Sequence, residues 1–159
     1  MKNILPSLVK KLIEKHGGGK PFFDELDMSL ACTPYFRELN NLFIDYEVYK
    51  LNIICSGGFG HAYQAYMKDQ FADLVICLPG GLREAKELCV DEYSYLFFDK
   101  KFIFVDDSLY SGNTYRVIQN AVRNAGGDVT RAFVIYDGSP DYNEDVISLY
   151  RYHGKLEYV

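Results

Sequence analysis

The sequence predicts an α/β protein built on a parallel β-sheet. Four short apolar runs, of the kind found in strands buried on both faces, lie at 51–56, 73–81, 102–107 and 128–138. Glycine-containing turns follow these runs, and segments with helical spacing separate them. This alternation is typical of βαβ units, whose connections place the loops after the strands at one edge of the sheet.

Two helices are expected before the first strand. Ile4, Leu5, Leu8, Leu12 and Ile13 lie near one helical face, which predicts a helix over about residues 4–15 that glycines then end. A second helix is predicted from Thr33 to about Tyr49. Thr33 is a residue type that caps helices, and Pro34 suits the first turn, where no amide donor is needed.

Two further helices are expected between the strands. The segment HAYQAYMKDQF (61–71) follows the first apolar run, and a helix over about 114–124 follows the third. The tail, SLYRYHGKLEYV (148–159), has the pattern of a small hairpin turning at Gly154.

Composition limits the class of protein. The 159 residues are 48% hydrophobic and 25% charged, the balance of a globular chain of one domain. No apolar run approaches the length of about 20 residues that crosses a bilayer, and we expect neither a signal peptide nor a membrane segment. The net charge of −5 argues against broad nucleic-acid binding, which needs a basic face.

The cysteines predict no metal site and no disulfide framework. Cys32, Cys55, Cys77 and Cys89 form no CxxC pair and have no histidine nearby. Cys55 and Cys77 fall within apolar runs, where a free cysteine packs as a small hydrophobic residue. A reducing cytoplasm fits this pattern best.

Chemistry concentrates after the third apolar run. Asp106 and Asp107 end that run, and we expect both carboxylates to be exposed there with partners. Small and hydroxyl residues follow, and a helix begins at once, so its unpaired amides and positive dipole end face the same loop. Such a loop binds a phosphate monoester, while the acids suit sugar hydroxyls or a sugar-bound Mg²⁺. The alternative is a turn that only caps the helix.

The segment Phe102–Thr114, FIFVDDSLYSGNT, resembles the binding motif for 5-phosphoribosyl-1-pyrophosphate (PRPP) in type I phosphoribosyltransferases. The resemblance implies that Asp106 and Asp107 contact the ribose 2- and 3-hydroxyls. It further implies a 5-phosphate loop made of Ser108, Leu109, Tyr110, Ser111, Gly112, Asn113 and Thr114.

The resemblance also implies a three-layer, phosphoribosyltransferase-like fold in one domain, residues 1–159. It covers about residues 50–138, the core. Residues 1–49 would form the variable helical hood that selects the base in this family, and residues 139–159 a C-terminal extension.

Two other segments match positions at which the family binds pyrophosphate. Ser56, Gly57 and Gly58 open the first βα loop, where glycines leave amides free for anionic oxygens; a simple tight turn is the alternative. Arg83 and Lys86 lie where family members carry a flexible catalytic loop whose cations neutralise the leaving diphosphate. The alternative for these two is a solvated helix face.

The acceptor is less defined. Hypoxanthine-guanine members carry an aspartate where this chain has Tyr110, and tyrosine is a poor base at neutral pH, so a 6-oxopurine is disfavoured. Tyr136 and Asp137 follow the fourth apolar run, at a position where the family often contacts the base.

Together these features imply a cytoplasmic, Mg²⁺-dependent homodimer that transfers the phosphoribosyl group of PRPP to a small nitrogenous base and releases pyrophosphate. Mg²⁺ would be bound mainly through PRPP, with Asp106 and Asp107 as further ligands. The alternative is a regulatory protein of the same fold that binds PRPP or a nucleotide without transfer. The sequence leaves open which base is used and which of these two activities the chain has.

Overall fold

A computed structural model describes residues 4–17, 19–48, 52–68, 70, 72, 74–78, 94–139 and 143–151. The helices are α1 (Ile4–His16), α2 (Lys20–Leu30), α3 (Thr33–Asp45), α4 (Gly57–Met67) and α6 (Asn113–Asn124), with a short 3₁₀ helix, η1 (Ser94–Leu96). The strands are β1 (Asn52–Ser56), β2 (Leu74–Leu78), β3 (Lys101–Leu109), β4 (Asp128–Asp137) and β5 (Val146–Arg151).

The described strands form one sheet in the order β2-β1-β3-β4-β5, and every neighbouring pair is parallel. The predicted α/β class with a parallel sheet is therefore confirmed. From β1 the chain passes to β2, which pairs with one edge of β1, and then to β3, which pairs with its other edge. The order of the strands thus reverses between β1 and β3, and parallel sheets bind ligands beside such a reversal, at the carboxyl ends of the strands.

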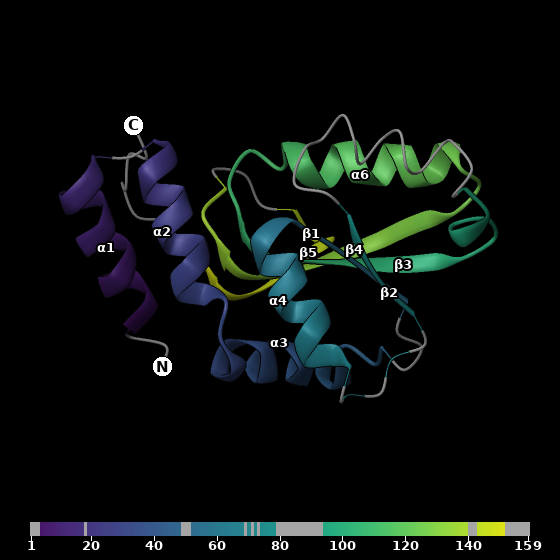
Figure 1. Cartoon of the computed structure of the whole chain (residues 1–159), viewed down its shortest axis with the longest axis horizontal. Helices are drawn as coiled ribbons and strands as arrows, with labels where there is room; N and C mark the ends of the chain where they lie inside the picture. The colour runs from purple at the N-terminus through teal and green to yellow at the C-terminus, as the bar shows by residue number, and fades with distance from the viewer. Residues whose placement is uncertain are drawn as a thin grey trace.

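Helices cover both faces of the sheet (Figure 1). Helix α6 lies on one face, α3 and α4 lie on the other, and α1 and α2 stand together at one end of the molecule. The strands supply side chains to both layers alternately: Ile53 and Cys55 pack in the cluster with α2, α3 and α4, whereas Ile54 packs in the cluster with α6. No helix among the described residues is long and apolar enough to cross a membrane.

Helix α2 was not predicted. It begins with Pro21 in its first turn, where the missing amide costs no hydrogen bond, and it buries Phe22, Leu26 and Leu30 along one stripe. These three residues are spaced four apart. This spacing is present in the sequence, but the glycines before Lys20 predicted only the end of the first helix. They also precede the first residue of α2.

Helix α3 starts where expected but is shorter than expected. Cys32, and not Thr33, is the residue that precedes its first turn, and the Cys32 side chain makes no capping hydrogen bond. The helix ends at Asp45 instead of about Tyr49, because the chain turns at Tyr46 and Glu47, where Glu47 has a φ of 57°.

Two boundaries near the strand ends also differ from the prediction. Helix α4 starts at Gly57, four residues before His61, so the glycine segment is its first turn and not a loop. Strand β3 runs on through Asp106 and Asp107 to Leu109, because Asp106, Ser108 and Leu109 pair with β4. The acid pair therefore lies inside β3, near the carboxyl end of this central strand.

The C-terminal region joins the sheet. Residues 146–151 form β5, which pairs in parallel with β4, so the predicted hairpin strand before Gly154 is instead the edge of the main sheet. Gly154 itself lies outside the described residues.

The turn after α6 generates the first testable prediction. A Cβ at Gly127 would lie 2.3 Å from the carbonyl oxygen of Phe97 and 3.1 Å from that of Lys100. Backbone at such a distance must move, so we expect Gly127→Ala to lower the free energy of unfolding by about 1–3 kcal/mol in urea titrations. Gly58→Ala is the matched control, since nothing lies within 4 Å of the added Cβ. Equal unfolding midpoints for the two variants would contradict this packing.

Candidate functional site

A cavity of about 370 Å³ opens at the carboxyl ends of β1 and β3, beside the reversal of strand order. Its volume is within the range of small-ligand sites. Three parts of the chain meet there: α2, the start of α4, and the end of β3 with the start of α6. The lining residues are Phe23, Asp27, Phe104 and those at 56–59 and 106–115.

The start of α4 turns free amides toward this cavity. Ser56 precedes the helix with an extended backbone and makes no side-chain capping bond, so the first amides of the helix have no partner from a cap. Gly57 has a φ of 68°, which only glycine adopts readily. Gly58 is exposed, and nothing lies within 4 Å of the position of a Cβ there. The protein's own packing does not require glycine at 58, and the backbone is open to a close ligand.

The start of α6 forms the other end of the cavity. Gly112 precedes the helix with a φ of 76°, which explains the glycine in this loop. The Ser111 hydroxyl oxygen accepts a hydrogen bond from the Asn113 amide at 3.2 Å, and Arg116 Nη1 donates to the Ser111 carbonyl at 3.1 Å. Two helix N-termini, those of α4 and α6, thus line one cavity, and their positive dipole ends favour an anionic ligand.

The acid pair is held by the backbone that follows it. Asp106 Oδ1 accepts from the Asp107 amide at 2.9 Å, and Asp107 Oδ1 accepts from the Ser108 amide at 2.7 Å. The expectation that both carboxylates are exposed was wrong for Asp107, which is 4% exposed; Asp106 is half-buried. The reason is the length of β3, which carries both residues into the sheet beneath α2.

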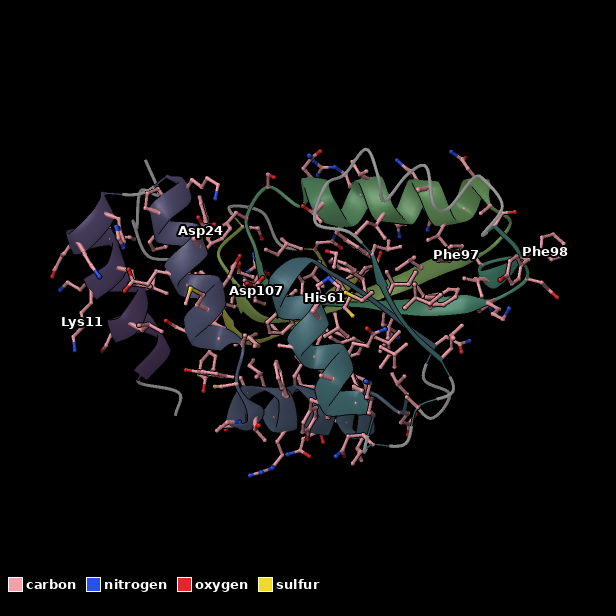
Figure 2. All side chains as sticks on the ribbon, viewed as in Figure 1. Lys11, Asp24, His61, Phe97, Phe98 and Asp107 are labelled. Atoms are coloured by element: carbon pink, nitrogen blue, oxygen red, sulfur yellow. The ribbon has the colours of Figure 1, made fainter. Side chains whose placement is uncertain are left out.

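Asp107 has a neighbour that the sequence did not indicate, Asp27 of α2. Figure 2 shows Asp107 between α2 and the start of α4. Asp107 Oδ2 is a buried acceptor, and with both carboxyls ionised it has no hydrogen-bond donor among the described residues. A proton on the Asp27 carboxyl would supply that donor. Burial and the hydrogen bond with Asp107 raise the pKa of Asp27 to about 9, so Asp27 is protonated at neutral pH.

Burial also changes the ionisation of the acid pair. It raises the pKa of Asp106 to about 6, although hydrogen bonds from Asp107 act in the opposite direction. Burial and the nearby Asp106 charge raise the pKa of Asp107, whereas the hydrogen bond with Asp27 lowers it, which places the shared proton on Asp27. A hydroxyl donor or a cation that enters the cavity would therefore stabilise the ionised forms of these carboxyls.

Aromatic contacts join α2 to the loop between β3 and α6. The Phe23 ring packs edge-on against Tyr110, with ring centroids 4.9 Å apart, and Tyr110 also contacts Tyr136 at 5.9 Å. Such pairs stabilise by about 0.5–1.5 kcal/mol each beyond the burial of their area. Helix α2 is thus attached to the loop at Tyr110 and to the strand end at Asp107.

The structure brings most of the predicted site residues together. Ser56, Gly57 and Gly58 share the cavity with all nine residues of the segment Asp106–Thr114. Tyr136 and Asp137 do not line it. Both are buried, and Asp137 accepts from the Ser139 hydroxyl at 2.6 Å and pairs with Arg151 at 3.6 Å. Arg83 and Lys86 lie outside the described residues.

Phe23 and Asp27 line the cavity from a helix that was not predicted. They stand four apart on α2, beside the buried stripe of that helix. Recognising α2 from the spacing of Phe22, Leu26 and Leu30 would have placed both on one face. Nothing in the sequence indicates that this face meets Asp107, which lies 80 positions further along the chain.

The acids do not form a protein-built metal site. Among the described residues, no group of three or more His, Cys, Asp or Glu side chains is placed to hold a metal ion. Asp107 is already hydrogen-bonded to Asp27, which leaves Asp106 as the half-buried carboxylate of the pair. Any Mg²⁺ here would have to take most of its oxygen ligands from the bound molecule.

The fold is similar to a crystal structure of a hypoxanthine-guanine phosphoribosyltransferase from Bacillus anthracis. The TM-score is 0.47 with 10% sequence identity, and the match covers 81% of this chain and 78% of that one. No protein-family model matches the sequence, and a search of curated proteins finds no match.

The raised pKa of Asp27 generates a prediction about stability against pH. The folded protein keeps a proton on Asp27 between its unfolded value near 3.8 and about 9, so the unfolded state binds fewer protons in that window. The free energy of unfolding should therefore fall as pH rises from about 5 to 8. A single titrating carboxyl contributes at most about 1.4 kcal/mol per pH unit to this slope, and the raised pKa values of Asp106 and Asp107 act in the same direction.

Asp27→Asn tests this origin of the slope. The asparagine amide still donates to Asp107 but does not titrate, so urea titrations across this pH range should show a smaller slope than in the unmodified protein. Asp45→Asn, at an exposed position at the end of α3, is the matched control and should keep the original slope. A slope unchanged by Asp27→Asn would show that the proton is held elsewhere.

Proposed function

We propose that this protein is a phosphoribosyltransferase, which transfers the 5-phosphoribosyl group of PRPP to a small nitrogenous base and releases pyrophosphate. The observation that carries the proposal is the meeting of an acid pair and two helix N-termini at one cavity, at the reversal of strand order. PRPP has matching chemistry, because a phosphate and a diphosphate flank a ribose with two neighbouring hydroxyls.

Each part of the cavity has a task in this proposal. Asp106 and Asp107 accept hydrogen bonds from the ribose hydroxyls. The amides from Ser108 to Thr114, with the hydroxyls of Ser111 and Thr114, bind the 5-phosphate at the start of α6. The amides of Gly57 and Gly58 bind the diphosphate at the start of α4. The two anionic groups would then lie at separate helix ends with the ribose between them.

The reaction itself asks the protein for position and charge stabilisation. A ring nitrogen of the base forms a bond to ribose C1 as the bond from C1 to the diphosphate oxygen breaks, and the bonding pair leaves with pyrophosphate. The Gly57 and Gly58 amides stabilise the departing charge, and Arg83 and Lys86 are proposed to approach it from the segment after β2. Asp106 would help to hold a Mg²⁺ that is bound mainly through PRPP, and the ion would supply positive charge against the charge that develops on pyrophosphate.

The site for the acceptor base is proposed at the carboxyl end of β4. Tyr136 and Asp137 are retained as proposed base contacts, although both are buried and would need the segment after β4 to move. Tyr110, with its phenol ring in place of a carboxylate, supports an acceptor other than a 6-oxopurine. A cytoplasmic location and a homodimeric state complete the proposal.

One observation favours the alternative of a protein that binds PRPP or a nucleotide without transferring it. Asp27 hydrogen-bonds to Asp107 inside the cavity, and Phe23 of the same helix packs on the loop at Tyr110. A ribose hydroxyl that donates to Asp107 must therefore displace the Asp27 carboxyl or share the Asp107 carboxyl with it. A ligand that releases α2 in this way would change the surface of the protein, which is the behaviour of a sensor.

Binding of PRPP tests both readings of the site. Asparagine at 106 or 107 keeps the Oδ1 acceptor that the following amide uses but removes the negative charge, so the fold should persist. We expect Asp106→Asn and Asp107→Asn to weaken PRPP binding about 10- to 100-fold in calorimetry with Mg²⁺, the loss typical of a hydrogen bond to a charged group. Asp45→Asn should bind as the unmodified protein does. If the unmodified protein binds no PRPP, both readings fail.

Turnover separates the transferase from the sensor. Pyrophosphate release from PRPP should be measured with orotate, uracil, adenine, hypoxanthine, guanine, xanthine and nicotinate in turn. For a transferase, one acceptor other than a 6-oxopurine should support release, and Arg83→Gln with Lys86→Gln should lower kcat at least tenfold with a smaller change in PRPP affinity. Tight PRPP binding without release for any acceptor would favour the sensor.

A further inference from the structure

Cys55 and Cys77 are neighbours across two strands. They occupy paired positions of β1 and β2, which run in parallel. Adjacent strands are about 4.8 Å apart, and residues paired in register point to the same face of the sheet. That separation of Cα atoms lies within the range that disulfides span.

Both sulfurs lie beneath the first turn of α4. The Cys55 thiol donates to the carbonyl of Gly60 at 3.4 Å, and a Cβ at Gly60 would lie 3.1 Å from Cys77 Sγ and 3.3 Å from Cys55 Cβ. Only a glycine lets the helix approach the pair this closely. The position of this turn therefore depends on how the two sulfurs pack.

The two thiols differ in access and reactivity. Cys55 is fully buried, whereas Cys77 is partly exposed on the edge strand β2. When the single Cys55 thiol proton points to the sulfur of Cys77 instead of the Gly60 carbonyl, that hydrogen bond lowers the pKa of Cys77. An accessible sulfur with a lowered pKa beside a buried partner on the adjacent strand is the arrangement of an attacking and a resolving cysteine. Both are free thiols in this structure.

We propose that Cys55 and Cys77 form a reversible disulfide that displaces the first turn of α4. The oxidant is a small-molecule disulfide such as oxidised glutathione. The Cys77 thiolate attacks one glutathione sulfur, the sulfur–sulfur bond of glutathione breaks, and one glutathione thiolate leaves. The Cys55 thiol then gives its proton to the second glutathione as that glutathione leaves Cys77, and the Cys55 sulfur bonds to Cys77 Sγ. Two protein thiols are oxidised as one glutathione disulfide is reduced to two thiols.

The consequence follows from the position of Cys55 in the chain. A disulfide brings the sulfurs to about 2.05 Å, so the packing against Gly60 must change. Cys55 directly precedes Ser56, after which the amides of Gly57 and Gly58 line the cavity. Oxidation would thus alter the site assigned to the diphosphate, a step that rests on the proposed function.

Peptide mapping of the whole chain tests the bond. After incubation with oxidised glutathione, a non-reducing digest analysed by mass spectrometry should show Cys55 linked to Cys77, and dithiothreitol should reverse it. Cys55→Ala should instead trap glutathione on Cys77, Cys77→Ser should leave Cys55 unmodified, and Cys32→Ser should behave as the unmodified protein. The proposal would be overturned if glutathione stayed on Cys77 in the unmodified protein, or if Cys55 or Cys77 formed a disulfide with Cys32 or Cys89. Both outcomes are measured on the unmodified protein, so they do not depend on whether a variant folds.

Hydrogen exchange tests the displacement without any ligand. Oxidation should speed amide exchange at least several-fold in the peptide that contains residues 57–60 and not in the α6 peptide; equal exchange there would overturn the displacement. PRPP calorimetry on both forms then separates this proposal from the proposed function. Binding about tenfold weaker after oxidation supports both. No binding by the reduced protein refutes the proposed function, while the map and the exchange data still decide the disulfide and its effect.

Discussion

The parallel pairing of β1 with β3 at the centre of the sheet is the constraint on which the rest of the structure depends. It places the carboxyl ends of two βα units, β1 with α4 and β3 with α6, side by side, although β2 lies between them in the chain. Because a helix follows each of these strands directly, the N-termini of α4 and α6 face one cavity. The features that would favour an anion here come from the backbone, since free amides and helix dipoles collect at this point.

The side chains then determine what kind of anion the cavity suits. The carboxyls of Asp106 and Asp107 stand between the two helix starts, so the cavity is favourable for phosphate at its ends and for hydroxyls in its middle. The glycines have distinct physical reasons: Gly57 and Gly112 adopt positive φ values, while Gly60 admits the close approach of the cysteine pair. This division of tasks is the reason for proposing a phosphorylated ribose, and not a simple phosphate, as the ligand.

Helix α2 brings side chains of the N-terminal region into the lining of this cavity. Its buried stripe holds it against the core, and from there Asp27 reaches Asp107 and Phe23 reaches Tyr110. The shared proton between two carboxyls makes this attachment weaken as pH rises, because ionising Asp27 places a second negative charge against the buried Asp107 carboxyl. The same helix would therefore both shape the cavity and respond to what enters it.

The sequence by itself determined the α/β class, the boundaries of most strands and the segments that meet at the site, because apolar runs, glycines and the phrase VDDSLYSGNT are local signals. It did not determine the burial of Asp107, since that depends on β3 pairing with β4 as far as Leu109. It could not reveal Asp27 or the juxtaposition of Cys55 and Cys77, since packing between distant segments and strand register set these contacts. Local propensity places residues on elements, but only the tertiary structure decides which elements face each other.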